Sequence, residues 1–313
     1  MTKRMRTIRF HAYGEPADVL RLEEAAIPSP AAGQIRVRVH ACGLTPADWA
    51  LCRGLFATEL PRGVGLDVSG TVDAVGEGVP RLQLGDRVLG AVDYSRYPSA
   101  GASDYAILTA WTRVPGGLDL LDAAALPMAV ETASRSLDGL GVAAGQTLLV
   151  YGAGTMMGFA AVQMALMRGA RVIAVAGETF AGQLRNLGVA VTSYGHRMVE
   201  RVREICGGVP DLILDAGPIS DVLPDLVEIA GGDGRRVLTI SNHGPAADAL
   251  GVRNSFARGL RHDAFGEFAK LAAEGRFTIP VARTFRLEDW REAVDLSVSG
   301  QAHGKLVLLM AQA

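Results

Sequence analysis

Apolar and polar residues alternate along the first third of the chain. Residues 35–41 read Ile-Arg-Val-Arg-Val-His-Ala, and the alternation recurs at 70–76 and 86–92, with glycine-rich turns between these segments. A period of two predicts strands that bury one face. Short strands at this spacing predict a β-barrel or β-sandwich in the N-terminal part of the chain.

From about Leu120 onward the pattern changes to apolar runs that alternate with helix-like segments. The predicted strands are 147–151, 171–176, 189–192, 211–215 and 236–241, and the predicted helices are 120–140 (interrupted by Pro127), 155–169, 180–187, 198–206 and 222–230. Strands that are apolar on both faces fit a parallel sheet covered by helices. This part predicts a doubly wound domain of five or six strands. The tail, with helices at 265–274 and 287–297 and strands at 279–285 and 305–310, is expected to return to the first domain.

Composition and charge narrow the class of protein. Of the 313 residues, 49% are apolar and 20% are charged, which is typical of a globular chain. The net charge of −2 does not provide the excess positive charge with which proteins bind nucleic acid or an anionic membrane. The longest apolar stretch, Met156 to Met167, is too short to span a bilayer. No apolar segment of the kind found in signal peptides follows the basic N-terminus, so a soluble cytoplasmic protein is expected.

The cysteine count excludes two further classes. Cys42, Cys52 and Cys206 are too few for a disulfide framework or a four-cysteine zinc site. We interpret all three as ordinary small buried residues. The six histidines show no metal-ligand spacing.

A glycine-rich turn follows the predicted strand at 147–151. It reads Gly152-Ala153-Gly154-Thr155-Met156-Met157-Gly158 and opens a predicted helix. Glycines let the backbone approach a pyrophosphate, and the helix N-terminus supplies N–H groups and partial positive charge. The third glycine stands at 158, whereas the G-x-G-x-x-G fingerprint requires it at 157. The strand–turn–helix–strand context nevertheless favours nucleotide binding over a tight turn without a ligand.

The end of the next strand bears on which nucleotide binds. An acidic residue there would hydrogen-bond the ribose and select NAD, whereas Ala176 and Gly177 leave room for a 2′-phosphate and favour NADP(H). Glu178, 20 residues past Gly158, is the candidate for that acidic role, but it is expected to lie beyond the strand tip. Arg185 is the nearest cation, and it is either a phosphate contact or a solvated helix residue.

An ordered series of motifs runs through nearly the whole chain. The series is Tyr13-Gly-Glu-Pro-Ala-Asp-Val-Leu20, Ala41-Cys-Gly-Leu-Thr-Pro-Ala-Asp48, Gly65-Leu-Asp-Val-Ser-Gly70, Val75-Gly-Glu-Gly78, Gly85-Asp-Arg-Val88, Ala123-Ala-Ala-Leu-Pro127 and Gly304-Lys-Leu-Val-Leu308. With these motifs the chain resembles the medium-chain dehydrogenase/reductase superfamily, and most of all its zinc-free quinone oxidoreductase and enoyl reductase branch. The resemblance implies an α/β fold, in which a doubly wound Rossmann domain (122–261) is inserted in a GroES-like, partly open β-barrel catalytic domain (1–121 and 262–313). It also implies NADP(H) in the cleft between the domains, and a homodimer.

The same resemblance bears on metal chemistry. Zinc-dependent relatives place a cysteine ligand at the position of Thr45, and their Gly-His-Glu segment falls on Gly65-Leu66-Asp67. Threonine and leucine cannot replace a thiolate and an imidazole, so no metal is expected. Without a metal, the localised alkoxide of a simple ketone is poorly stabilised. A quinone or an α,β-unsaturated carbonyl spreads the charge, and hydrogen bonds then suffice. We therefore expect hydride transfer from NADPH to a quinone or a conjugated C=C.

Candidate site residues follow from the resemblance. The substrate side is assigned to Thr45, Trp49 and Arg53, with core packing as the alternative for Trp49. Asp48 and Asp67 are expected to form ion pairs with Arg53 or Arg87. The cofactor side is assigned to Thr132 near the nicotinamide, the turn from Gly152 to Met156, and the strand ends Ala176, Gly177, Ala216, Ser241 and Asn242, with Arg185 nearby.

Four residues depart from the family pattern and keep a second hypothesis open. Thr155 and Met156 replace glycines, Phe180 replaces a phosphate-binding lysine, and Phe56 stands where a tyrosine acid often lies. The alternative is a nucleotide-binding or pathway protein on the same fold with little or no reductase activity.

Overall fold

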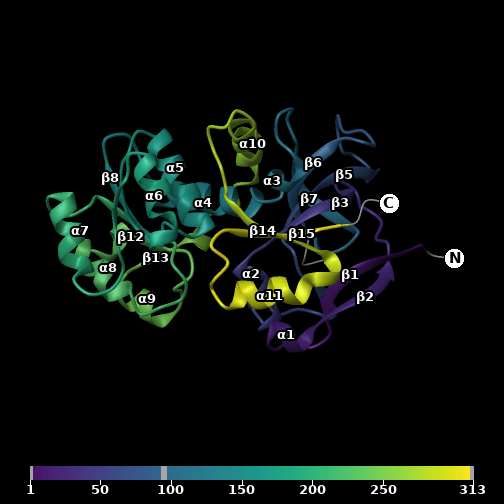
Figure 1. Cartoon of the computed structure of the whole chain (residues 1–313), viewed down its shortest axis with the longest axis horizontal. Helices are drawn as coiled ribbons and strands as arrows, with labels where there is room; N and C mark the ends of the chain where they lie inside the picture. Colours follow the sequence, from purple (N-terminus) through teal and green to yellow (C-terminus); the bar gives the residue numbers. More distant parts are fainter. Residues whose placement is uncertain (1–2, 93–96, 311–313) are drawn as a thin grey trace. The chain divides into compact units, whose positions relative to one another are not determined.

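The computed structural model describes residues 3–92 and 97–310, and the chain divides into two compact units (Figure 1). The first unit contains Met1–Met128 together with Phe265–Ala313, and the second contains Ala129–Ala264. The boundaries expected from the sequence, 121/122 and 261/262, lie slightly N-terminal to both divisions.

The first unit is built on two sheets. Its strands are β1 (Arg4–Phe10), β2 (Leu20–Ala26), β3 (Ile35–Leu44), β4 (Arg62–Gly63), β5 (Asp67–Val75), β6 (Arg87–Val92), β7 (Tyr105–Arg113), β14 (Val281–Arg286) and β15 (Lys305–Leu309). Three form a small sheet in the order β2-β1-β4, and six form a larger one in the order β14-β15-β3-β5-β6-β7. Because β3 also pairs with β7, strands β3, β5, β6 and β7 close on one another. This confirms the partly open barrel.

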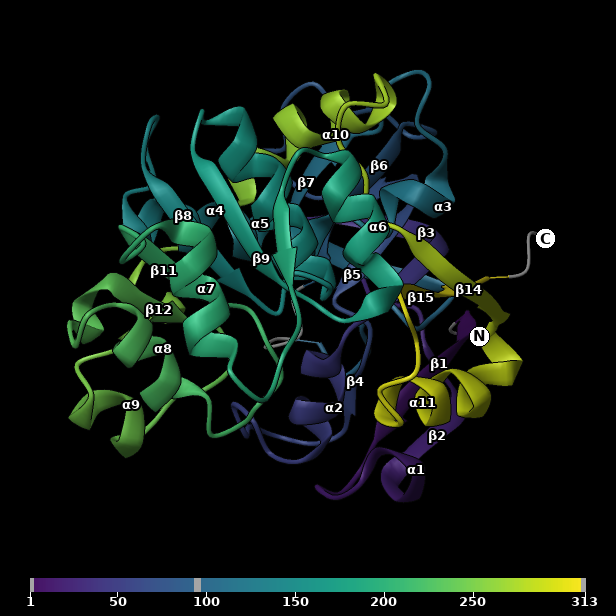
Figure 2. The same cartoon turned by 60° about the vertical axis from the view of Figure 1, so that its left-hand side comes forward.

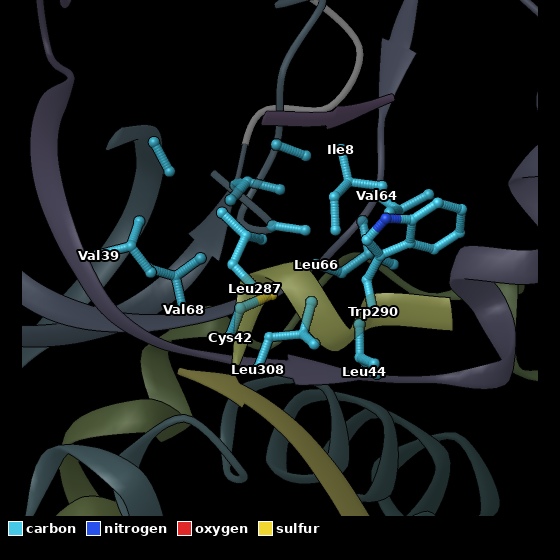
Figure 3. Close-up of a cluster of buried hydrophobic side chains, with 14 of the residues drawn as sticks. Ile8, Val39, Cys42, Leu44, Val64, Leu66, Val68, Leu287, Trp290 and Leu308 are labelled. Atoms are coloured by element: carbon cyan, nitrogen blue, oxygen red, sulfur yellow. The ribbon is translucent and has the colours of Figure 1, made fainter. Parts of the chain in front are cut away.

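Helices and a buried cluster complete the first unit. The helices are α1 (Pro16–Val19), α2 (Pro46–Cys52), α3 (Leu120–Ala123), α10 (Phe265–Ala273) and α11 (Trp290–Val298), and α4 (Pro127–Leu140) begins here. Figure 3 shows Leu287 and Trp290 of the C-terminal segment in one buried cluster with the barrel side chains Val39 and Val68, with Val64 and Leu66 drawn beside the Trp290 ring. The C-terminal segment is therefore part of the barrel core, as its apolar pattern predicts.

The hairpin β1–β2 was not predicted. Its outward positions are charged, and they pair across the strands, as Arg4 does with Glu24 and Arg9 with Glu23. The many charged residues in this segment obscure the apolar pattern formed by the buried residues Met5, Ile8 and Phe10.

The second unit is a six-stranded sheet covered by helices. Its strands are β8 (Thr147–Tyr151), β9 (Arg171–Val175), β10 (Ala190–Thr192), β11 (Leu212–Asp215), β12 (Val237–Thr239) and β13 (Arg253–Asn254), all parallel, in the order β10-β9-β8-β11-β12-β13. Its helices are the rest of α4, α5 (Met156–Met167), α6 (Glu178–Asn186), α7 (Met198–Cys206), α8 (Leu223–Ile229) and α9 (Pro245–Ala249). The doubly wound domain is confirmed.

The winding direction reverses at the centre of this sheet. The chain moves from β8 through α5 and α6 to β10, and then crosses back through α7 and α8 to β11 and β12. Right-handed crossovers therefore place the two pairs of helices on opposite faces. Figure 2 shows α7 and α8 together on one side of the sheet, where Met198, Val202 and Leu226 pack against Leu149 and Ile213. Ligands of doubly wound folds bind outside the carboxyl edge at such a reversal, which here lies between β8 and β11.

The three cysteines differ in how far they are buried. Cys42 and Cys52 are fully buried, but Cys206, in the last turn of α7, is only half-buried, so the interpretation of all three as buried was wrong for Cys206.

In the part of the chain that the structure describes, no helix is long and apolar enough to cross a membrane.

A buried ion pair closes the barrel at its C-terminal strand. The Nζ of Lys305, the first residue of β15, donates to Oδ2 of Asp67, the first residue of β5, and both side chains are about 97–99% shielded from solvent. Oδ1 of Asp67 accepts from the backbone N of Met128 at 2.7 Å, at the start of α4. The ion pair thus joins the two separate segments of the first unit.

Replacing Lys305 by methionine should be strongly destabilising, because it leaves a buried carboxylate without its ammonium partner. We expect the free energy of unfolding in urea to fall by about 3–5 kcal/mol. Lys270→Met is the matched control, since Lys270 pairs with Glu274 at 3.9 Å on the surface and should cost no more than about 0.5 kcal/mol. Equal losses in the two variants would contradict a structural role for the Lys305–Asp67 pair.

Candidate functional site

The glycine turn joins β8 to α5 at the carboxyl edge of the parallel sheet. Gly152 has a φ of +77°, and a Cβ there would lie 2.4 Å from the backbone N of Gly217. A Cβ on Gly158 would lie 2.2 Å from the carbonyl oxygen of Gly152. Both positions therefore require glycine. The third glycine stands at 158 because the backbone of α5 lies against the carbonyl of Gly152 at that residue.

Thr155 is the N-cap of α5. Its Oγ1 accepts from the backbone N of Gly158 at 3.0 Å, and lies 3.0 Å from the carbonyl oxygens of Gly152 and Ala216, to which the hydroxyl can donate. The threonine thus holds the turn against the loop after β11. The residues fit a pyrophosphate, because the turn leads into the N-terminus of a twelve-residue helix, where the first N–H groups have no intrahelical acceptor.

A buried polar network fixes the loops after β11 and β12. Asp215 ends β11, and its carboxylate accepts from Thr239 Oγ1 at 2.7 Å, Asn242 Nδ2 at 2.8 Å and Gly217 N at 3.1 Å. Asn242 Oδ1 accepts from Ser220 N at 2.8 Å. Burial raises the pKa of Asp215 in spite of these donors. Sequence reasoning named Ala216, Ser241 and Asn242 but missed Asp215, whose only signal is an acid at the end of an apolar strand.

This network bears on the cofactor-binding role predicted for Asn242. Its side-chain amide is occupied on both sides within the protein, by Asp215 and by Ser220. The side chain therefore shapes the edge of the sheet by joining the loops after β11 and β12. Ala216 and Ser241 stand beside it on the same two loops.

At the tip of β9, Ala176 and Gly177 precede α6, which begins at Glu178. Arg185 is in the last turn of α6 and exposed, about 10 Å along the helix axis from the tip. This placement favours the solvated-helix interpretation of Arg185 over a phosphate contact. Phe180 is buried, with its ring beside Gly154 and tilted against Phe159 at a centroid distance of 5.7 Å. It is a packing residue under the turn.

A cavity of about 580 Å³ opens at the same edge, between α7 and α8. Tyr151 and Ser220 lie at its end nearest the glycine turn, and His196 and Arg197 come from the loop after β10. That loop is held by Arg201, which donates from Nε to Thr192 Oγ1 at 2.9 Å and from Nη2 to the Ser193 carbonyl at 2.7 Å. No motif in the sequence marks this cavity.

Two tyrosines meet beside the cavity. The rings of Tyr151 and Tyr194 stand edge to face with their centroids 5.2 Å apart, and burial raises the pKa of Tyr194 to about 12. Both hydroxyls therefore stay protonated at neutral pH.

In the first unit, Thr45 and Asp48 form a capping arrangement at the start of α2. Asp48 Oδ2 accepts from Thr45 N at 2.8 Å and from Thr45 Oγ1 at 3.2 Å, and Oδ1 accepts from Gly65 N at 2.6 Å. The hydroxyl proton of Thr45 is thus directed at a carboxylate. Toward a ligand this hydroxyl can therefore act as an acceptor.

The expected ion pairs of Asp48 and Asp67 were wrong. Arg53 pairs with Glu15 at 2.7 Å, and Arg87 donates to the carbonyl of Leu118. Asp48, the third residue of α2, accepts hydrogen bonds from Thr45 at the start of its own helix. Asp67 forms its ion pair with Lys305. Lys305 is one of only three lysines in the chain, and its place at the start of an apolar strand was the available signal.

The other substrate-side candidates separate into core and surface. Trp49 is 3% exposed and donates from Nε1 to Ser297 Oγ at 2.7 Å, which favours core packing over substrate stacking. Arg53 is half-exposed in its pair with Glu15, and Phe56 is exposed with a φ of +51°. Thr132, on α4, is buried in the second unit, and its Oγ1 donates to Glu131 Oε2 at 3.2 Å.

At the positions where the resemblance implies metal ligands in zinc-dependent relatives, Thr45 and Leu66 do not offer the ligands that zinc requires. The hydroxyl of Thr45 donates to Asp48, and Leu66 has only a hydrocarbon side chain, packed in the barrel core. Among residues 3–92 and 97–310, no three His, Cys, Asp or Glu side chains come together as a possible ligand set.

Removing the hydroxyl of Thr155 should loosen the glycine turn. Thr155→Ala is expected to lower the free energy of unfolding by about 1 kcal/mol through loss of the N-cap. Thr155→Ser keeps the hydroxyl and should stay within about 0.3 kcal/mol of the parent. Urea unfolding followed by circular dichroism measures both, and an equal loss in the serine variant would show that the methyl group matters instead.

The buried carboxyl of Asp48 should make stability depend on pH. Burial raises its pKa from 3.8 to about 6, so the native state binds a proton that the unfolded chain releases between those values. The contribution of Asp48 is therefore most favourable below about pH 4, is lost as pH rises to about 6, and stays constant above that. In Asp48→Asn this dependence disappears, so the variant should gain about 2 kcal/mol relative to the parent between pH 4.5 and 7.

Urea unfolding at several pH values compares the two proteins, with Glu59→Gln, a variant of an exposed acid, as control. Profiles for the parent and Asp48→Asn that run parallel would show that Asp48 titrates normally.

Two family models and many relatives match this chain. Residues 31–120 match the alcohol dehydrogenase GroES-like domain, and residues 187–308 match the zinc-binding dehydrogenase model. A quinone oxidoreductase from Lama guanicoe is 30% identical over 98% of both chains. An erythronolide synthase of Saccharopolyspora erythraea is 36% identical over 63% of this chain and 6% of the synthase. The solved structure of an NAD-dependent alcohol dehydrogenase, 26% identical, covers 98% of this chain and 100% of its own, with a TM-score of 0.82.

Proposed function

The chain belongs to the medium-chain dehydrogenase/reductase superfamily, in its quinone oxidoreductase branch, and on that premise we propose that it is an NADPH-dependent reductase of quinones or of the C=C of α,β-unsaturated carbonyls. The observation that carries the proposal is the glycine turn at the sheet reversal between β8 and β11. A strand, a glycine turn and a helix N-terminus at this point favour a dinucleotide over other ligands.

The residues that would hold the cofactor lie along one sheet edge. The backbone from Gly152 to Met156 would receive the pyrophosphate, and the loops at Ala216 and Asn242 would form the adjoining wall. The cavity beside Tyr151 would take the adenosine end. When bound, the reduced nicotinamide supplies the hydride, and Thr132 is the residue proposed to face it.

Small residues at the tip of β9 support NADP(H) over NAD. Ala176 and Gly177 offer no carboxylate to a ribose hydroxyl, and Glu178 already belongs to α6. Arg197, the N-cap residue of α7 in the lining of the cavity, is better placed than Arg185 to meet a 2′-phosphate.

The substrate class follows from what the first unit offers for developing negative charge. Thr45 turns its proton to Asp48, and Leu66 offers no donor. A localised alkoxide would therefore be poorly stabilised, whereas a quinone or an enone spreads the charge over a conjugated system. This supports conjugated acceptors and chemistry without zinc.

The test is NADPH oxidation by purified protein with a panel of benzoquinones, naphthoquinones and enones, and with saturated ketones as the matched controls. We expect turnover with at least one conjugated acceptor, none with the saturated ketones, and a lower KM for NADPH than for NADH. Tight NADPH binding without turnover on any acceptor would overturn the reductase and favour a nucleotide-binding protein on the same fold. A lower KM for NADH would overturn the cofactor preference alone.

A further inference from the structure

Helix α4 carries an ion pair that is buried within the second unit. Nε of Arg135 lies 2.6 Å from Oε1 of Glu131, and Nη2 lies 3.1 Å from Oε2, so the contact is bidentate. The side chains are 4% and 6% exposed. Their neighbours on the helix, such as Val130, Ala133 and Leu137, are apolar and fully buried.

Stability alone does not account for such a pair. The cost of removing two charges from water commonly equals or exceeds their attraction, and apolar residues of similar volume stabilise a core as well. What a bidentate pair adds is direction, because it holds the groups that are hydrogen-bonded to it in one orientation.

Four groups are held in this way. Glu131 Oε2 accepts from the Thr132 hydroxyl at 3.2 Å, and Oε1 accepts from the backbone N of Arg261 at 3.2 Å. Arg135 Nη1 donates to the carbonyl of Ser255, and the guanidinium lies over the Phe256 ring at 5.3 Å from its centroid.

These groups reach the carboxyl edge of the sheet. Ser255 directly follows β13, and the Phe256 ring lies 5.0 Å from the ring of His243, in the loop after β12. We call Thr132, His243, Ser255 and Phe256 the α4–β13 wall. The loops after β12 and β13 in this wall lie at the same edge as the glycine turn and the Asp215 network, because the strands are parallel, and Thr132 is linked to them through Glu131 and Arg135.

We propose that Glu131 and Arg135 are positioning residues for the nicotinamide half of the cofactor, because their ion pair orients the Thr132 hydroxyl and fixes the backbone of the α4–β13 wall. The inference rests on the proposed function. With its proton directed at Glu131, the Thr132 oxygen can accept from an N–H of a ligand, such as the amide group of nicotinamide. Neither residue is expected to contact the cofactor itself.

The test separates the two halves of the cofactor. Calorimetry measures binding of NADPH and of 2′-phospho-ADP-ribose, which lacks the nicotinamide ring, to the full-length parent, Glu131→Gln and Arg135→Lys. Both variants keep the side-chain volume but lose the bidentate charge pair. We expect NADPH to bind about tenfold more weakly, as for one lost hydrogen bond, while affinity for the fragment stays within about twofold. Glu274→Gln, in the exposed Lys270–Glu274 pair, is the matched control and should change neither.

Two outcomes overturn the inference: parallel weakening of NADPH and of the fragment, as a general structural defect would give, or no change in either. Arg135→Lys keeps the positive charge, so it supplies the test if Glu131→Gln does not fold. Failure of NADP(H) binding, the part of the proposed function on which the inference rests, is distinct, because the parent itself would then bind neither ligand.

Discussion

The ion pair between Lys305 and Asp67 is the contact on which the architecture of this chain depends. The second unit is inserted between Met128 and Phe265, so the first unit must be assembled from two segments far apart in the sequence. Strand β15 joins them by pairing with β3, and Lys305 then reaches a carboxylate 238 residues earlier. The other oxygen of that carboxylate accepts from the backbone N–H of Met128, the second residue of α4. One buried acid therefore closes the barrel and anchors the helix that continues into the second unit.

The same acid bears on the chemistry. Asp67 follows Leu66, at the positions where the resemblance implies the Gly-His-Glu segment of zinc-dependent relatives, and here Asp67 is engaged by an ammonium and a backbone N–H. Thr45, at the remaining ligand position, is bound to Asp48. The polar groups of this region satisfy one another. This arrangement is consistent with a substrate whose negative charge is spread by conjugation.

Hydrogen bonds within the protein also organise the edge of the parallel sheet. Thr155 ties the glycine turn to the loop after β11, Asp215 ties that loop to the loop after β12, and Arg135 ties α4 to the end of β13. Hydrogen bonds made in advance reduce the cost of ordering a binding site. The residues that depart from the family pattern, Thr155 and Phe180, have structural roles in the turn, and those roles are compatible with a bound pyrophosphate.

The periodic parts of this fold were predictable from the sequence, and the side-chain partners were not. The strand Thr147–Tyr151 and the helix Met198–Cys206 have the predicted bounds because apolar periodicity marks them directly. The partners of Asp67 and Arg53 were missed, since Lys305 and Glu15 are brought to them only by the sheet pairing and the packing of α1 and α2. The Glu131–Arg135 pair shows in the sequence as an acid and a base four residues apart, but this spacing usually marks a solvated face, and its burial comes from the tertiary fold.

The most direct measurement is the rate of NADPH oxidation by the best conjugated acceptor, with protein that has been treated with a strong chelator and assayed for zinc. This rate is compared with the rate of the untreated protein. It is also compared with the rate of the same treated protein when the NADPH is deuterated at C4 of the nicotinamide. A rate that is unchanged by chelation and slowed by deuteration is the predicted result. Activity that disappears with the metal and returns on addition of zinc would contradict the account.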